Sequence, residues 1–483
     1  MALRNIAIIA HVDHGKTTLI DVLLRQSGAF RENQRVEERA MDSNDLERER
    51  GITILAKVTS LVWKDTRINI VDTPGHADFG GEVERILSMV DGVVILVDAA
   101  EGPMPQTKFV LGKALAQGLR PIVVINKIDR PDARHLEVLE EIFDLFIALD
   151  AKPEQLDFPV LYGSGKQGWM AAEPEGPKES LAPLLDKVVE YVPEPKVEQG
   201  PFRMLVTTIE RNAFLGRLLT GRIFSGSVKA GDAIHSLSRD GKEIEKGRVS
   251  KVLAFRGLER TPIEVAEAGD IIAIAGLEES TVANTITIPQ NNEPLPAKPI
   301  DPPTLSVTFR INDGPLAGRE GDKVQSRVIR DRLLREAEGN VAIRVTEGTD
   351  SDSFEVAGRG ELQLAVLIEN MRREGFELTI GRPRVVLREE NGQKLEPVEE
   401  VIIDVDDEHS GVVVQKLTER KGDLVDMRPS GTGRTRLRFY VPTRSLIGYQ
   451  PELLSDTRGT AIFNRLFHEY QPYKGALPGR RTG

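Results

Sequence analysis

Residues 10–18 place a lysine, two threonines and a glycine where a strand meets a helix. The run reads Ala-His-Val-Asp-His-Gly-Lys-Thr-Thr, follows the apolar segment 5–9 and precedes the apolar-periodic segment 19–24. This order predicts a phosphate-binding loop, in which backbone N–H groups and the positive end of the helix hold a phosphate. We expect the nucleotide contacts of this loop to come from Asp13, His14, Gly15, Lys16, Thr17 and Thr18.

Two residues of this loop have specific chemical roles. The Lys16 ammonium should reach the β- and γ-phosphates, and the Thr17 hydroxyl should be a ligand of Mg²⁺. The usual first glycine of such a loop is Ala10 here. His11 and His14 are expected to pack and hydrogen-bond within the loop rather than to catalyse. The loop alone therefore leaves open which nucleotide binds.

A carboxylate at the end of a second strand belongs to the same expected site. Asp72 follows the apolar strand 68–71 and opens the sequence Asp-Thr-Pro-Gly-His. Ligands of open α/β sheets bind at the carboxyl ends of the strands. We expect Asp72 to hold Mg²⁺ through water and the Gly75 N–H to contact the γ-phosphate.

The segment Asn-Lys-Ile-Asp at 126–129 is expected to select the base. An ionised Asp129 carboxylate only accepts hydrogen bonds, and guanine offers it two donors where adenine offers an acceptor. Asn126 should tie this segment to the phosphate loop, and the Lys127 stem should lie over the base. Although such a tetrapeptide also forms ordinary turns, the ordered set of motifs predicts GTP. Further base contacts are expected from backbone N–H groups of Ser164, Gly165 and Lys166.

The elements around these motifs indicate a multidomain chain. Alternating apolar strands and amphipathic helices predict a parallel α/β sheet, after which short strands with Gly-containing turns predict an antiparallel β-barrel. Two α+β segments, each compatible with a ferredoxin-like βαβ unit, follow a second Pro-rich break. The expected domains are 1–198 (P-loop GTPase), 199–292 (β-barrel), 302–383 and 384–483 (both ferredoxin-like).

Composition narrows the class of protein. The 483 residues include no cysteine, which excludes disulfides and thiolate metal sites. A net charge of −11 argues against a general nucleic-acid coat. The first strand begins by Leu3, and the longest apolar run, 93–97, is a buried strand rather than a membrane span. We expect a cytoplasmic protein that does not bind membranes, with a monomer as the default state.

Several segments together resemble the TypA/BipA subfamily of translational GTPases. The phosphate loop, the segment 50–54 and the segment 72–76 look like translational GTPases in general, and the segment 77–85 resembles TypA/BipA in particular. Agreement continues at 358–362, 396–400, 444–449 and 456–459. The long module with which elongation factor G displaces tRNA is missing. The sequence stops about where the family's C-terminal domain begins, so we expect a form without that domain.

The resemblance implies a GTPase stimulated by the ribosome. Thr53 would complete the magnesium shell when GTP is bound, and His76 would orient the attacking water beside the catalytic Lys16. Val12 and Ile52 match the apolar gate that restrains this histidine, and Asp13 is a candidate ligand of a monovalent cation. The implied partners are both ribosomal subunits with their RNA, and tRNA is a candidate. The implied roles are stress adaptation, translation regulation and large-subunit assembly.

The final module carries the clearest basic stretch. Arg434, Arg436 and Arg438 alternate along an expected strand and would share one face. Such a face could follow an RNA backbone, or it could simply be a solvated sheet surface. Two other functions stay open at this point. One is a LepA-like or elongation-factor-like GTPase, and the other is an RNA-binding assembly module for which GTP is a docking signal.

Overall fold

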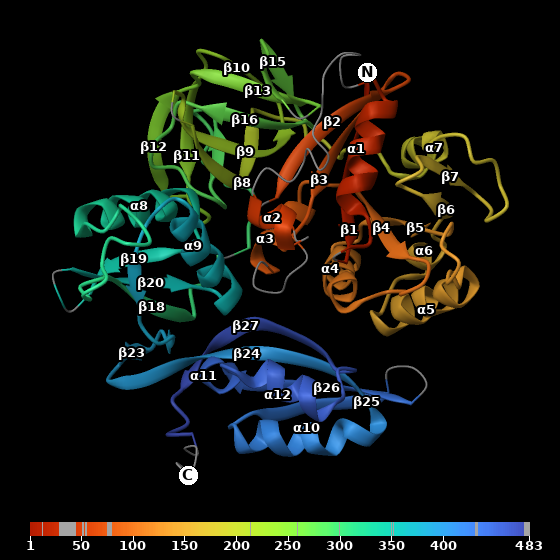
Figure 1. Cartoon of the computed structure of the whole chain (residues 1–483). Coiled ribbons are helices and arrows are strands. Elements are labelled where there is room, and N and C mark those ends of the chain that lie inside the picture. The colour runs from red at the N-terminus through yellow and green to blue at the C-terminus, as the bar shows by residue number, and fades with distance from the viewer. Residues whose placement is uncertain are drawn as a thin grey trace. The chain divides into compact units, whose positions relative to one another are not determined.

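A computed structural model of the chain divides into two compact units, Met1–Ile300 and Asp301–Gly483 (Figure 1). Each unit is described by itself. The structure describes residues 1–11, 13–28, 45–50, 53, 56–74, 80–212, 214–257, 259–298, 300–348, 350, 352–429 and 433–477.

A seven-stranded sheet forms the first half of unit 1. Its strands lie in the order β2-β3-β1-β4-β5-β6-β7. The pairs among β3, β1, β4, β5 and β6 are parallel, and only the outer strands β2 and β7 run antiparallel to their neighbours. The strands are β1 (Ala2–Ala10), β2 (Lys57–Trp63), β3 (Thr66–Asp72), β4 (Gly92–Asp98), β5 (Arg120–Asn126), β6 (Val160–Ser164) and β7 (Trp169–Ala171).

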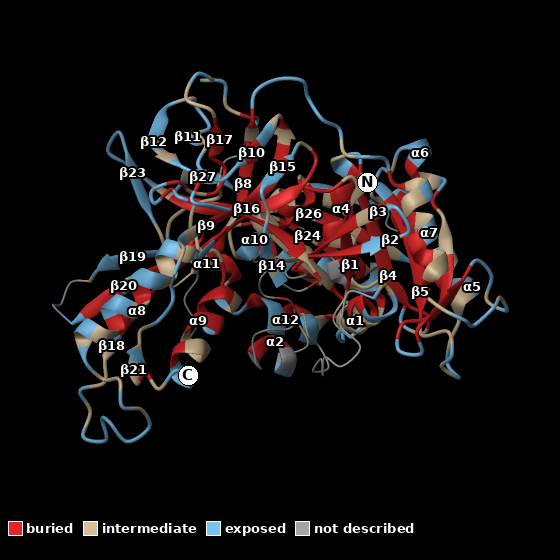
Figure 2. Cartoon of the chain, turned by 90° about the horizontal axis from the view of Figure 1, so that it is seen from above, coloured by how far each residue is buried: buried red, intermediate tan, exposed pale blue. Residues whose placement is uncertain are grey.

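Helices cover both faces of this sheet, which explains why its central strands are continuously apolar. One buried cluster joins α1 and α7 to the sheet, and a second joins α3, α4 and α5 to the opposite face (Figure 2). The helices are α1 (Lys16–Gln26), α2 (Asp45–Arg50), α3 (Gly80–Leu87), α4 (Pro105–Ala116), α5 (His135–Ala148), α6 (Pro153–Leu156) and α7 (Ala182–Tyr191).

The second half of unit 1 is antiparallel. Eight strands lie in the order β12-β11-β17-β8-β9-β16-β13-β14, and β10 pairs separately with β15. The strands are β8 (Arg203–Asn212), β9 (Gly216–Ser225), β10 (Ser227–Lys229), β11 (Ala233–Leu237), β12 (Glu243–Arg248), β13 (Lys251–Arg256), β14 (Glu259–Pro262), β15 (Val265–Glu267), β16 (Ile271–Ala275) and β17 (Thr285–Thr287).

Polar contacts join the two halves of unit 1. Ser60 of β2 and Gly257, just after β13, exchange backbone hydrogen bonds of 3.4 and 2.9 Å. The Ser60 hydroxyl donates to the Phe255 carbonyl across 2.5 Å. Arg222 of β9 pairs with Asp91, which precedes β4, across 3.0 Å, and both side chains are largely buried. The barrel strands are therefore tied directly to the seven-stranded sheet.

Unit 2 contains two sheets with the same strand order. The first is β19-β20-β18-β21, and the second is β27-β24-β26-β25, so each follows the ferredoxin-like pattern in which the first and third strands are central. The first module comprises β18 (Leu305–Ile311), α8 (Ser326–Gly339), β19 (Arg344–Glu347), β20 (Ser353–Gly358), α9 (Glu361–Arg373), β21 (Leu378–Ile380) and β22 (Arg384–Val385).

The second module of unit 2 has a longer central strand and two short helices. It comprises β23 (Arg388–Glu390), β24 (Gln393–Asp406), α10 (Asp407–Glu419), β25 (Asp423–Pro429), β26 (Arg434–Pro442), α11 (Thr443–Leu446), α12 (Tyr449–Asp456) and β27 (Ile462–Pro472). The predicted fold class is confirmed. In the described parts of the chain, no helix is both long and apolar enough to cross a membrane.

Candidate nucleotide site

The phosphate loop enters α1 through a glycine whose backbone conformation disfavours any side chain. Gly15 has a φ of 95°, in the left-handed region. A Cβ atom there would lie 2.7 Å from the Asn126 side-chain nitrogen. That nitrogen donates to the His14 carbonyl across 2.8 Å, and the Asn126 Oδ1 accepts the Gly165 N–H across 2.8 Å. The predicted tie between Asn126 and the phosphate loop is confirmed.

Lys16 contacts two other expected site residues, Thr53 and Asp72. Its Nζ is 2.7 Å from the Thr53 hydroxyl, 2.8 Å from the Thr73 carbonyl and 2.5 Å from Asp72 Oδ1. The Thr53 hydroxyl also donates to Asp72 Oδ2 across 3.3 Å. Asp72 is almost fully buried at the end of β3. Lysine, threonine and aspartate from three distant segments therefore converge at one edge of the sheet.

These side chains suit a magnesium ion. Hydroxyl and carboxylate oxygens are the protein ligands that Mg²⁺ prefers, and it usually takes few of them, with substrate phosphates and waters supplying the rest. The Thr53 hydroxyl and the Asp72 carboxylate already face one another, and Thr17 lies in the first turn of α1. No group of three or more His, Cys, Asp or Glu able to hold a metal occurs in the described part of the chain. A site completed by phosphates does not require such a group.

The base-recognition loop lies beside the phosphate loop. Lys127 has a φ of 64°, and its Nζ donates to the Asp13 carbonyl across 2.6 Å, which brings its stem along the entrance between the two loops. Asp129 is exposed and accepts a hydrogen bond from the Gln167 amide across 3.1 Å. The Gly165 N–H donates to Asn126 Oδ1 and so joins the segment after β6 to the base-recognition loop, and the guanine contacts expected of Ser164, Gly165 and Lys166 remain predictions.

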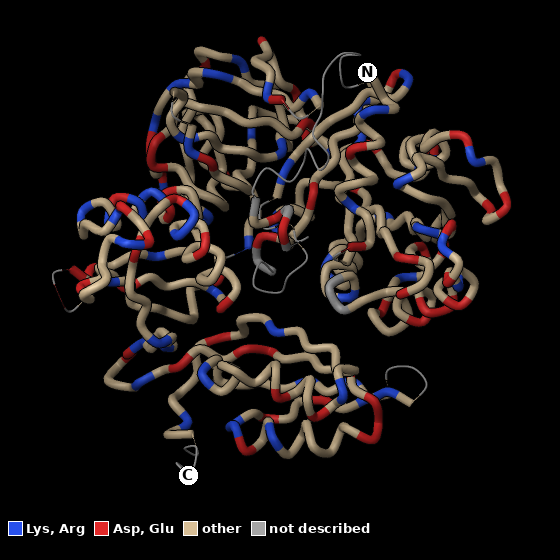
Figure 3. The backbone as a smooth tube through the Cα atoms, viewed as in Figure 1, with Lys and Arg blue, Asp and Glu red and all other residues tan. Residues whose placement is uncertain are grey.

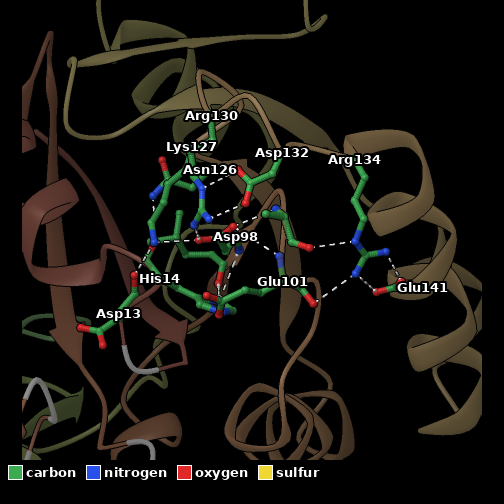
Figure 4. Close-up of polar contacts among 12 residues, drawn as sticks. Asp13, His14, Asp98, Glu101, Asn126, Lys127, Arg130, Asp132, Arg134 and Glu141 are labelled. Carbon is green, nitrogen blue, oxygen red and sulfur yellow. Dashed lines mark hydrogen bonds and ion pairs between the residues drawn. The ribbon is translucent and has the colours of Figure 1, made fainter.

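Asp98 also belongs to this group of residues, although the sequence motifs did not predict it. It ends β4, its side chain is fully buried, and its Oδ2 pairs with Lys127 Nζ at 2.7 Å and Arg130 at 3.3 Å (Figure 4). Although burial raises the pKa of this carboxyl, hydrogen bonds from Lys127 and two backbone N–H groups hold it below its usual range. The signal available in the sequence was an aspartate at the end of the buried strand 92–98.

His14 is a buried packing residue, as its place in the loop predicted. Its ring is fully buried; Nδ1 lies 3.3 Å from the Asp98 backbone nitrogen, and Nε2 lies 3.3 Å from a Glu101 carboxylate oxygen. Burial lowers the pKa of His14, and the Glu101 charge opposes this effect only in part. The ring is therefore neutral at pH 7, with Nε2 as the donor to Glu101.

Several predicted residues stay untested. Val12, Ile52, Gly75 and His76 lie outside the described residues. Thr17 and Thr18 lie in the first turn of α1, and Asp13 has a φ of 62° within the loop. Ser164 ends β6, and Lys166 is exposed in the following turn.

The three arginines of β26 do share a face, but each one meets a carboxylate of the neighbouring strand β24. Arg436 forms two hydrogen bonds with Asp404, of 2.8 and 2.9 Å, and both side chains are largely buried. Arg434 pairs with Asp406 at 3.4 Å, and Arg438 pairs with Glu400 at 3.4 Å. Acidic and basic residues are interspersed over the module (Figure 3). Much of the arginine charge is neutralised, and RNA contact remains a prediction.

Comparison with known protein families matches three parts of the chain. Residues 1–194 match the family Elongation factor Tu GTP binding domain. Residues 216–287 match Elongation factor Tu domain 2, and residues 393–481 match Elongation factor G C-terminus. The matched segments coincide with the α/β sheet, the antiparallel strands and the last module.

Comparison of the whole chain with individual proteins gives relatives that match nearly all of it. The chain is 53% identical over 480 residues to the large ribosomal subunit assembly factor BipA of Salmonella typhimurium, an alignment that covers 99% of this chain and 79% of that protein. It is 52% identical over 483 residues to the protein of the same name in Bacillus subtilis, covering 100% and 79%. A solved crystal structure of a protein from Thermus thermophilus shares the fold with a TM-score of 0.68 at 18% identity, covering 98% of this chain and 97% of that one.

Proposed function

This chain belongs to the BipA family of translational GTPases, and we propose that it binds the ribosome and hydrolyses GTP during assembly of the large subunit. The observation that carries the proposal is the convergence of Lys16, Thr53 and Asp72 beside the loop bearing Asp129. This set can bind phosphates, a magnesium ion and a guanine base at one sheet edge. Stress adaptation and translation regulation are proposed as the settings of this activity.

The phosphate groups of GTP should replace the present partners of Lys16. The ammonium pairs with Asp72 and Thr53, and it can exchange these contacts for β- and γ-phosphate oxygens by rotating its flexible stem. Thr17 and Thr53 would hold a magnesium ion through their hydroxyls, and Asp72 would hold it through water, so that positive charge would face the same phosphates. Because Thr53 would join this set only with a γ-phosphate bound, the segment that carries it would report the nucleotide state.

His76 is the proposed catalytic residue that orients the attacking water, with Val12 and Ile52 as its gate. Asp13 remains the candidate ligand of a monovalent cation. The trigger is proposed to come from ribosomal RNA. Two arginines near the site in the described part of the chain, Arg130 and Arg134, are paired with Asp98, Asp132 and Glu141, so neither is free to act as an arginine finger.

The proposed partners are both ribosomal subunits, with tRNA as a further contact, and the proposed state is a cytoplasmic monomer. The main alternative is an RNA-binding assembly factor for which GTP serves as a docking signal and turnover is incidental. A LepA-like or elongation-factor-like role is disfavoured by the identity to BipA proteins over the whole chain.

Turnover measurements separate the proposal from this alternative. GTP hydrolysis is measured with and without purified ribosomes for the native chain, for His76→Ala, and for His135→Ala at the start of α5 as a matched control. Ribosomes should accelerate the native chain and the control. The His76 variant should lose about 10²-fold or more of the stimulated rate while still binding GTP. Equal stimulated rates for the His76 variant and the native chain would refute the assignment.

The base pocket is tested by Asp129→Asn. The amide presents a donor where the carboxylate presents only acceptors, so guanine should bind more weakly and xanthine, which has the complementary edge, more tightly. Competition between GDP and xanthosine diphosphate measures this preference. A variant that keeps its guanine preference contradicts the proposed pocket.

A further inference from the structure

Asp129 is held by a series of two side-chain hydrogen bonds that begins at a buried tryptophan. The Trp169 Nε1–H donates to the Gln167 Oε1 across 2.9 Å, and the Gln167 Nε2–H donates to Asp129 Oδ2 across 3.1 Å. Gln167 lies in the turn between β6 and β7, Trp169 is the first residue of β7, and Asp129 follows β5. The contact joins residues that lie 38 positions apart in the sequence.

The chemistry of the three groups fixes the direction of this series. Indole nitrogen is a donor only, so it must meet the oxygen of the Gln167 amide. The amide nitrogen then necessarily faces Asp129, whose ionised carboxylate only accepts. No other orientation of the amide satisfies both neighbours, because the reverse would place oxygen against carboxylate and NH₂ against N–H.

The starting point of the series is rigid. Trp169 is only 3% exposed and opens β7, where it pairs with Ser164 of β6. Gly168, with a φ of 79°, closes the turn by donating to the Ser164 carbonyl across 2.9 Å. Gln26 of α1 donates to the Gly168 carbonyl across 2.7 Å. The exposed Gln167 is therefore held between a fixed indole and the carboxylate.

We propose that Gln167, oriented by Trp169, is a positioning residue that sets the Asp129 carboxylate for guanine recognition. One carboxylate oxygen is held by the amide, which fixes the plane of the group and leaves its remaining lone pairs for the two guanine donors. The effect is preorganisation, since an exposed aspartate would otherwise rotate freely and lose rotamer entropy on binding. This inference rests on the proposed guanine pocket.

GDP affinity is the readout, measured with a fluorescent GDP analogue and by calorimetry with GDP. Gln167→Ala should weaken binding about 3- to 10-fold, the range expected for the net effect of one ordinary, solvent-exposed hydrogen bond. Trp169→Phe fills the indole site without an N–H, so it should give a smaller loss. The double variant should be no weaker than Gln167→Ala, since the tryptophan acts through the glutamine.

Gln167→Glu supplies a signature that a structural role would not give. A second carboxylate in hydrogen-bond contact with Asp129 repels it at pH 7.5, so GDP binding should be weaker than for Gln167→Ala. On acidification the two adjoining carboxylates share one proton, so position 167 again donates a hydrogen bond to Asp129. The affinity for GDP should therefore recover toward the native value near pH 5.5. The native chain, measured over the same pH range, corrects for titration of the nucleotide phosphate.

Gln415→Glu is the matched control, because the Gln415 amide also donates to a carboxylate, that of Glu419 on α10, across 3.0 Å. It should bind GDP as the native chain does at every pH. If Asp129→Asn loses guanine preference while both Gln167 variants bind GDP normally, the positioning role is overturned and the pocket stands. If Asp129→Asn keeps guanine preference, the pocket itself fails, and this inference fails with it.

Discussion

The Asn126 side chain donates to the His14 carbonyl across 2.8 Å and accepts the Gly165 N–H across the same distance, so one amide links the phosphate loop to both base loops. Asn126 is almost fully buried at the end of β5. The three loops come from separate strands, and this amide adds side-chain bonds between them to the backbone bond of 3.2 Å from the Ile128 N–H to the Gly163 carbonyl. Its loss should therefore affect binding more than folding.

Asn126→Ala should weaken GDP binding by about 10-fold or more. The substitution leaves a buried carbonyl and a buried N–H without a hydrogen-bond partner, and each such group costs about 1–3 kcal/mol of free energy. Asn212→Ala is the control, because it removes an amide that accepts two backbone N–H groups in the β8–β9 hairpin, within the barrel strands. Calorimetry with GDP should separate the two variants, and equal affinities would contradict the proposed link.

His14 should make the stability of unit 1 depend on pH. Burial holds its folded-state pKa below the unfolded value of about 6.5. As the pH falls through about 6.5, the unfolded chain takes up the proton first, so the free energy of unfolding should decrease. His14→Gln should remove this part of the decrease, seen in denaturant unfolding between pH 8 and 5.5. The comparison at pH 8, where His14 is neutral in both states, isolates the packing cost of the substitution. Equal pH slopes would exclude this linkage.

Arg222→Ala should destabilise the interface between the nucleotide-binding sheet and the barrel strands. The guanidinium pairs with Asp91 and donates to the carbonyls of Met89 and Lys196. Burial raises the pKa of Asp91, and the Arg222 charge opposes this effect. Removing Arg222 therefore leaves a buried carboxyl without its ion-pair partner. Breaking such a pair typically costs about 3–5 kcal/mol.

Denaturant unfolding of unit 1 measures this effect. Adding Asp91→Ala to Arg222→Ala should recover part of the loss, since the stranded carboxyl is removed as well. Lys187→Ala, at an exposed pair with Glu190 on α7, should change stability by less than about 1 kcal/mol. An Arg222 variant as stable as the Lys187 control would show that the interface does not rely on this pair.

Arg436 and Arg438 should behave differently although they share one face of β26. Arg436 is largely buried against Asp404, so Arg436→Ala should mainly lower the stability of unit 2. Arg438 is 41% exposed, and its pair with Glu400 is long. Arg438→Ala should therefore lower the slope of ribosome affinity against salt concentration by the amount expected for about one phosphate contact. Co-sedimentation with ribosomes at several salt concentrations measures the second effect. An unchanged salt dependence for Arg438→Ala argues against RNA contact at this position.

The polar residues at strand ends could be predicted from sequence because a parallel sheet brings its carboxyl ends to one edge. Lys16, Asp72, Asn126 and Asp129 follow apolar segments, and the regular order of strand and helix places them together. The two ferredoxin-like modules were recognisable only in part. Strands such as β25, which is exposed along its whole length, have no periodic apolar pattern for a sequence to show.

What the sequence by itself determined is the kind of chemistry it predicts: a phosphate loop, an aspartate expected to select guanine, and alternating strands and helices that place both at the carboxyl ends of a parallel sheet. The tertiary structure decided which partner each charged group meets. Asp98 bonds Lys127, Gln167 holds Asp129, and the arginines of β26 face carboxylates of β24. The physical reason is that these contacts depend on loop conformation and strand register between distant segments. A local pattern fixes which face a side chain occupies, but only packing fixes its neighbour across that face.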